Sequence, residues 1–175
     1  NSVNQNSFIP MRKSSFLLVL LFFIALVSCQ NNADNNELVV IAGTGNPGFK
    51  DGDNAALYKP IRFSTSKDNF VLFADISNHA IRMVDENGEV TTIAGGPDKK
   101  GFADGASDTA RLNSPHGVAY NARTNKIYVA SAKNHIIREI SETSNGEFMV
   151  KTIAGVPEKS GYKDGSVDSA LFRSP

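Results

Sequence analysis

The chain has 175 residues, of which 41% are hydrophobic, and its 18 basic and 18 acidic side chains leave a formal net charge of zero. Because nucleic-acid binders carry an excess of positive charge, this balance predicts no nucleic-acid partner. The single cysteine excludes an internal disulfide framework.

Residues 11–29 have the pattern of a bacterial export signal. Two basic residues follow Met11, and an uncharged apolar run then occupies positions 16–27. This run has the length of a signal-peptide core and is shorter than the ~20 residues that a membrane-spanning helix needs. Met11 is the only plausible start, so residues 1–10 are expected to be unstructured upstream sequence.

Cys29 closes this signal and predicts a lipid anchor. It follows Leu26-Val27-Ser28, which resembles the lipobox of bacterial lipoproteins. The resemblance implies that the thiol of Cys29 is acylated and that the membrane is a partner through this lipid. The alternative is cleavage near Ser28 beside an incidental cysteine. Residues 30–37 are polar and predict a tether, and Gln30 after the cysteine is similar to lipoproteins sorted to the outer membrane.

From residue 38 onward the sequence repeats itself. Ile-Ala-Gly recurs at 41–43, 93–95 and 153–155, and each copy is followed by an aromatic residue, an Asp-Gly pair and a proline. The three pairs are Asp51-Gly52, Asp104-Gly105 and Asp164-Gly165. A period of about 52 to 60 residues is typical of stacked or radially arranged supersecondary units. The sequence stops at Pro175, where a new repeat should begin, so we expect an N-terminal fragment of a longer protein.

Short β-rich runs separated by turn signals predict four strands in each of two repeats. The strands are expected at 61–64, 70–74, 80–84 and 90–94, and at 117–120, 127–130, 136–140 and 149–154. Asn-Gly pairs at 87–88 and 145–146 predict the hairpin between the third and fourth strands of each repeat. The predicted fold class is therefore all-β, with four-stranded antiparallel blades of a β-propeller.

Two further elements complete the predicted architecture. Residues 39–42 resemble a fourth strand without three strands before it, and this N-terminal strand is expected to complete the last blade of the ring. The connections that carry Asp-Gly end in Ala-x-Leu/Phe-x-x-Pro, which predicts one helical turn capped by Asp108 or Asp168. These connections are expected to be plugs between blades, with aromatic anchors at Phe49, Phe102 and Tyr162.

An Asn-His motif with a following arginine recurs on the third strand. Its positions are Asn78, His79 and Arg82 in the first repeat and Asn134, His135 and Arg138 in the second. Together with the Thr-Ile-Ala-Gly segments, this motif resembles the NHL repeat family over residues 38–175. The resemblance implies a propeller, commonly of six blades, in a family that includes extracytoplasmic proteins and an amidating lyase that uses zinc. Departures from the pattern are Ala80 and Ile136 in place of Leu, Ser131 in place of the Asp matched by Asp75, and Ile61 in place of the Gly matched by Gly117.

Histidines and aspartates raise the question of a metal site. His79 and His135 occupy equivalent places in successive blades, so they should not converge on one ion, and we expect each to bond backbone. His116 leads into an innermost strand at the channel mouth and is the candidate for metal or catalytic use. The Asp-Gly pairs lack the spacing of an EF-hand and are expected to form turns.

The function predicted from these features is binding. Arg82 and Arg138 are expected to pair across strands with acids such as Glu89 instead of contacting RNA. No nucleophile motif, phosphate loop or paired-cysteine site is present, so no catalytic residue, cofactor or enzymatic activity is expected. The leading hypothesis is a lipid-anchored propeller of the cell envelope that binds a protein, peptide or glycan. The alternative is a metal-dependent extracytoplasmic hydrolase or lyase with its site in the central channel.

Overall fold

The computed structural model describes residues 38–66 and 68–175, and the compact unit among them spans Val40–Pro175. The predicted signal peptide, the lipidation site Cys29 and the tether at 30–37 lie outside the described residues. Within the described part, no helix has the length and apolar character needed to cross a membrane.

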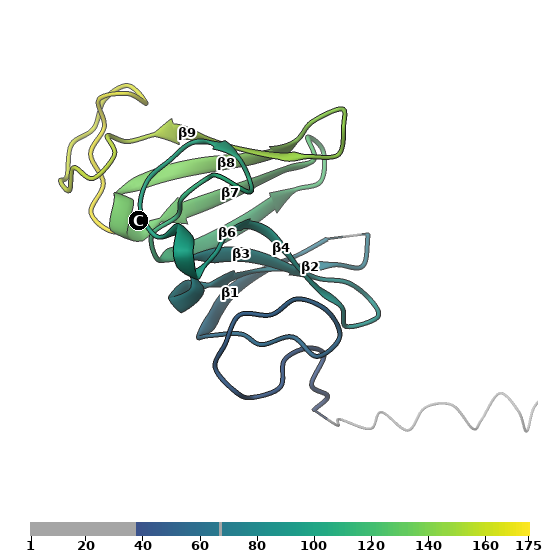
Figure 1. The fold of residues 1–175 in the computed structure, drawn as a ribbon. Coiled ribbons are helices and arrows are strands. Elements are labelled where there is room, and N and C mark those ends of the chain that lie inside the picture. The colour runs from purple at the N-terminus through teal and green to yellow at the C-terminus, as the bar shows by residue number, and fades with distance from the viewer. Residues whose placement is uncertain (1–37, 67) are drawn as a thin grey trace, which may run out of the picture. The chain divides into compact units, whose positions relative to one another are not determined.

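The first repeat forms an antiparallel sheet in the order β1-β2-β3-β4 (Figure 1). Its elements are β1 (Pro60–Thr65), β2 (Val71–Asp75), the 3-10 turn η1 (Ile76–Asn78), β3 (Ala80–Val84) and β4 (Val90–Gly95). Gly88 in the β3–β4 hairpin has a φ of 84°, a conformation that glycine adopts without a steric penalty. Its N–H donates to Asp85 O over 3.1 Å, which closes the turn.

The second repeat repeats this sheet and adds one short strand. Its elements are η2 (Pro97–Lys99), β5 (Gly105–Ala106), β6 (Pro115–Asn121), β7 (Lys126–Ser131), η3 (Ala132–Asn134), β8 (Ile136–Glu142) and β9 (Phe148–Ala154), in the sheet order β5-β9-β8-β7-β6. All eight predicted strands are confirmed, with ends that differ by at most about two residues. Strand β5 is new, and it belongs to the Asp-Gly connection, since Gly105 pairs with Val150. Gly52 forms the equivalent isolated bridge with Val90 in the first repeat.

One apolar core joins the two sheets, and β1 and β2 lie against β6 (Figure 1). The buried members of this core are Leu72, Ala74, Ile81, Ile93, Ala94, Ala110, Leu112, Ile127, Val129, Ile140 and Val150. Ala110 and Leu112 come from the connection before β6 and are fully buried, so this connection does fill space in the core. Its aromatic residue, Phe102, is half-buried. The anchor prediction was wrong for the other two connections, because Phe49 is 40% exposed and Tyr162 is 91% exposed.

The strand predicted at 39–42 pairs with no described strand, and Val39, Val40 and Ile41 are exposed. Its expected partner is the last blade of the ring, which is not one of the two described sheets, so completion of that blade stays a prediction.

One local prediction was wrong. A helical turn does form, but earlier than expected. Ala110 N donates to Ala106 O over 2.7 Å, so Asp108 lies inside the turn and does not cap it.

Candidate functional site

Arg82 is the centre of a buried network in the first repeat. Its Nη2 donates to Asp51 Oδ1 over 2.6 Å and to Lys50 O over 2.8 Å, and its guanidinium carbon lies 4.8 Å from the ring centroid of Phe49. Asp51 also accepts from Thr92 N over 3.1 Å and from Thr92 Oγ1 over 2.9 Å. The Asp-Gly connection is thereby attached to both β3 and β4.

Arg138 builds the same network in the second repeat. Its Nη2 donates to Asp104 Oδ1 over 2.5 Å and to Ala103 O over 2.7 Å, and Phe102 lies 5.3 Å away. Thr152 N and Oγ1 donate to Asp104 over 3.0 and 3.1 Å. Burial lowers the pKa of Arg138, and the neighbouring Asp104 carboxylate opposes that shift.

The prediction that these arginines pair with acids across strands is confirmed only for Arg82. Its Nη1 binds Asp75 on the neighbouring strand β2 over 3.0 Å, and Glu89 is not a partner. Both arginines are fully buried and also bind the acids of the Asp-Gly connections, which had not been predicted. The reason is that each connection folds over the face of the sheet to which the arginine side chain points. In the third copy, Asp164 and Gly165 carry the same motif without an arginine partner in the described part of the chain.

The Asn-His turn of the first repeat joins its sheet to the connections before and after it, and the turn of the second repeat reaches the connection that follows. Asn78 is buried and donates from Nδ2 to Gly48 O over 2.7 Å. His79 has a φ of 54°, and its Nδ1 accepts a hydrogen bond from Ser114 N over 3.1 Å. His135 has a φ of 59° and accepts in the same way from Ser174 N over 3.2 Å. The serine before each proline is the sequence signal for this partner, and we had not predicted it.

Two exposed side chains lie on bulges of the innermost strands. His116 is the extra residue between Pro115 and Gly117 in β6, and its Nδ1 lies 3.1 Å from Ser114 O. Arg62 is the extra residue in β1, with a φ of 47°. Bulges re-aim side chains and are common beside binding sites. Neither side chain forms an ion pair with another described residue.

The structure does not assemble a metal centre from the residues it describes. Among them, no group of three or more His, Cys, Asp or Glu side chains is placed to hold an ion. His79 and His116 both contact Ser114, whereas His135 contacts Ser174. Asp51 and Asp104 are engaged by arginines.

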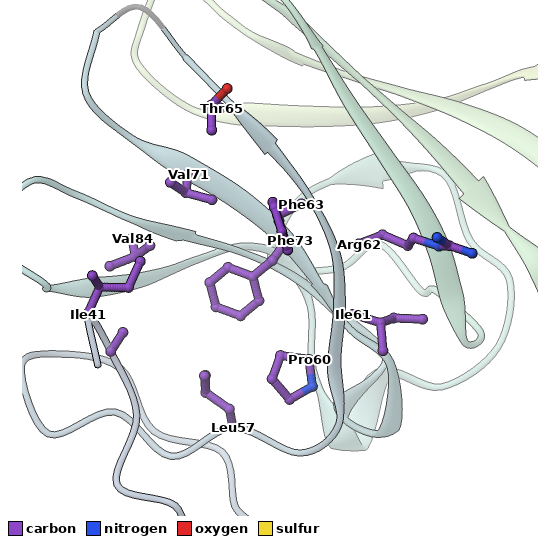
Figure 2. A pocket seen from close by; sticks show the side chains of 11 residues that line it. Ile41, Leu57, Pro60, Ile61, Arg62, Phe63, Thr65, Val71, Phe73 and Val84 are labelled. Atoms are coloured by element: carbon purple, nitrogen blue, oxygen red, sulfur yellow. The ribbon is translucent and has the colours of Figure 1, made fainter. Parts of the chain in front are cut away.

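A cavity of about 410 Å³, here called the apolar recess, opens on the face of the first sheet that does not meet the second sheet (Figure 2). Its lining is Ile41, Ala42, Leu57, Pro60, Ile61, Arg62, Phe63, Thr65, Val71, Phe73 and Val84. By strand register, Val71, Phe73 and Val84 correspond to Ile127, Val129 and Ile140, which pack in the core that joins the sheets. The residues of the apolar recess are therefore of the kind that packs one sheet against another.

The comparisons with known proteins agree with this architecture. The chain is 38% identical over 109 residues to the NHL repeat-containing protein 2 of Bos taurus, which covers 61% of this chain and 14% of that protein. It is 33% identical over 133 residues to the protein SUPPRESSOR OF QUENCHING 1, chloroplastic, of Arabidopsis thaliana, which covers 72% of this chain and 12% of that protein. The chain thus spans about one seventh or less of these relatives. No family model matches the chain.

Two solved structures from Bacteroides thetaiotaomicron share the fold. An auxiliary nutrient binding protein superposes with a TM-score of 0.54 at 22% identity, over 70% of this chain and 32% of that one. A protein of unknown function gives a TM-score of 0.54 at 21% identity, over 61% of this chain and 26% of that one. Both are β-propellers, and the two open sheets of the present chain are blades of that kind.

The arginine networks predict unequal effects of two equivalent mutations. In halide-free buffer, Asp104→Ala leaves Arg138 buried without a carboxylate and should cost about 3 kcal/mol of unfolding free energy in urea. Asp51→Ala should cost clearly less, because Arg82 keeps its second carboxylate, Asp75. Glu139→Ala breaks an exposed pair with Lys126, and as the control it should cost less than either aspartate variant. Equal losses for the two aspartates would contradict this account.

His79 predicts a pH dependence of stability. Burial and then the charge of Lys100 lower the pKa of His79 from 6.5. As the pH falls, the unfolded chain therefore takes up a proton before the folded chain does. This stability is present above pH 6.5 and is lost as the pH falls from 6.5 through the lower pKa of the folded state. Protonation also removes the acceptor for Ser114 N–H. His79→Asn, which tolerates the left-handed backbone, should flatten the change in melting temperature between about pH 7.5 and 5. His116→Asn should keep the wild-type slope, and an unchanged slope in His79→Asn would refute the assignment.

Proposed function

Because the chain belongs to the NHL repeat family, we propose that it is a lipid-anchored binding module of the cell envelope, whose ligand is a protein, peptide or glycan. The comparisons support a β-propeller interaction module. The anchor, the location and the choice of binding over catalysis are parts of the proposal.

The proposal rests on which charged side chains are already paired and which are not. Within each repeat, contacts to other residues of that repeat pair the buried arginine with the aspartate of the Asp-Gly connection: Arg82 with Asp51, and Arg138 with Asp104. Arg62 and His116, in contrast, are exposed on the two innermost strands and are free of those networks. Arg62 is a cation and His116 can become one, and both are held on rigid strands, so they suit a ligand with an acidic group.

The proposed anchor follows from the segment before the propeller. Acylation of Cys29 would fix the chain to the membrane, and more than one acyl chain gives stable attachment. The polar residues 30–37 would then hold the folded part away from the surface by at most about 28 Å. This arrangement leaves the ends of the innermost strands accessible to soluble ligands.

Binding can be tested with the purified full-length protein on arrays of envelope peptides and acidic glycans. For a ligand found in this way, Arg62→Ser and His116→Ser should each weaken affinity by about tenfold, which is the scale of one lost charged contact. The melting temperature should be unchanged. Arg123→Ser removes an exposed cation on the β6–β7 turn and is the matched control. If the two innermost variants bind as the control does, the ligand uses another surface.

The anchor has its own test. In cells that process lipoproteins, the wild-type protein should partition into the detergent phase of Triton X-114, and Cys29→Ser should move it to the aqueous phase. Gln30→Ser is a control that keeps the thiol. Detergent partitioning of Cys29→Ser like that of the wild type would show that the thiol is not the attachment point.

A further inference from the structure

The two repeats differ at one buried position that the first repeat fills with a carboxylate. Asp75 is fully buried at the end of β2 and accepts three hydrogen bonds. Tyr58 N donates to Oδ1 over 2.8 Å, Asn78 Nδ2 donates to Oδ2 over 2.7 Å, and Arg82 Nη1 donates to Oδ2 over 3.0 Å. One peptide N–H, one amide and one guanidinium therefore form a complete anion-binding set.

In the second repeat a serine occupies this position. Ser131 matches Asp75 by register, because each is the last residue of its strand and pairs with the proline that opens the innermost strand. Its Oγ donates to Asn134 Oδ1 over 2.8 Å. A neutral hydroxyl at this place cannot supply the negative charge or the two acceptor oxygens of the aspartate.

The three donors have counterparts in the second repeat. Asn113 matches Tyr58, because Ser77 N donates to Tyr58 O in the first repeat and Lys133 N donates to Asn113 O in the second. The other two counterparts are Asn134 Nδ2 and Arg138 Nη1. All three donor groups of the first repeat are therefore present again without the carboxylate that they bind.

One of these donors has no acceptor. Asn134 is fully buried, and its Nδ2 has no acceptor among the described residues, whereas Asn78 Nδ2 has two. Arg138 Nη1 donates to the neutral carbonyl Arg111 O over 3.2 Å, where Arg82 Nη1 donates to a carboxylate over 3.0 Å. The Nε atoms of both arginines lack an acceptor, so Nε does not distinguish the repeats. A buried donor without an acceptor is costly, and it indicates a bound group.

Charge gives the same indication. Arg82 faces two carboxylates, Asp51 and Asp75, while Arg138 faces only Asp104. One additional negative charge beside Ser131 would make the two repeats equal. Burial lowers the pKa of Arg138, and its one neighbouring carboxylate, Asp104, opposes that shift.

We propose that the Asn113 N–H, Asn134 Nδ2 and Arg138 Nη1 bind a small monovalent anion, a halide, in the position that the Asp75 carboxylate takes in the first repeat. The difference between aspartate and serine side chains is about two heavy atoms, which suits a single-atom anion and excludes one as large as sulfate. The halide supplies the charge and accepts from all three donors.

The test compares the full-length wild-type protein with Ser131→Asp and Ser131→Ala by thermal unfolding in sodium chloride, with gluconate holding the ionic strength constant. Above the dissociation constant, each tenfold rise in chloride should raise the wild-type melting temperature by roughly 3 to 6 °C. Ser131→Ala retains the three donors and should keep this dependence. Ser131→Asp supplies the carboxylate and should abolish it, and its melting temperature in low chloride should exceed that of the wild type.

Bromide soaks give a second readout that does not depend on the folding of any variant. An anomalous peak within hydrogen-bond distance of Asn134 Nδ2 and Arg138 Nη1 is expected in wild-type crystals. A water in that place, or the same chloride dependence in the wild type and in a folded Ser131→Asp, would overturn the proposal.

Discussion

Each repeat contains a buried guanidinium that needs hydrogen-bond acceptors and a counter-charge. Arg82 and Arg138 are fully buried, and removing such a charge from water is unfavourable unless hydrogen bonds and an opposite charge replace the lost hydration. The ligands come from the Asp-Gly connection, whose aspartate also binds the threonine of the outer strand. One charge therefore orders a connection and two strands, which explains why the aromatic, Asp-Gly and arginine elements recur together.

The two copies of this network are not equal in charge. The first contains two aspartates around its arginine, and the second has Ser131 where the first has Asp75. The backbone geometry is nevertheless the same, since both Asn-His turns place a histidine in the left-handed region and use its Nδ1 to hold the following connection. The backbone of the Asn-His turn therefore does not depend on the charge beside it, since the turn is the same with Ser131 as with Asp75.

We expect the functional residues among those that take no part in the arginine networks. The apolar recess repeats the composition of the packed sheet face, so stacking of sheets accounts for it. Arg62 and His116 have no such explanation, because both are exposed and lie on bulges at different places in β1 and β6, so neither has a counterpart in the other repeat. Residues that differ between the copies of a rigid scaffold are the natural means by which repeat proteins choose ligands.

The sequence by itself determined the strands, their grouping into two like sheets and the fold class, because alternation, turn residues and the repeat period are local signals. It did not identify the partners of the arginines. Asp51 and Arg82 are separated by 31 positions, and periodicity shows that both recur without showing that they meet. Only the tertiary structure decided these points, because hydrogen bonds and burial depend on which segments the fold brings together.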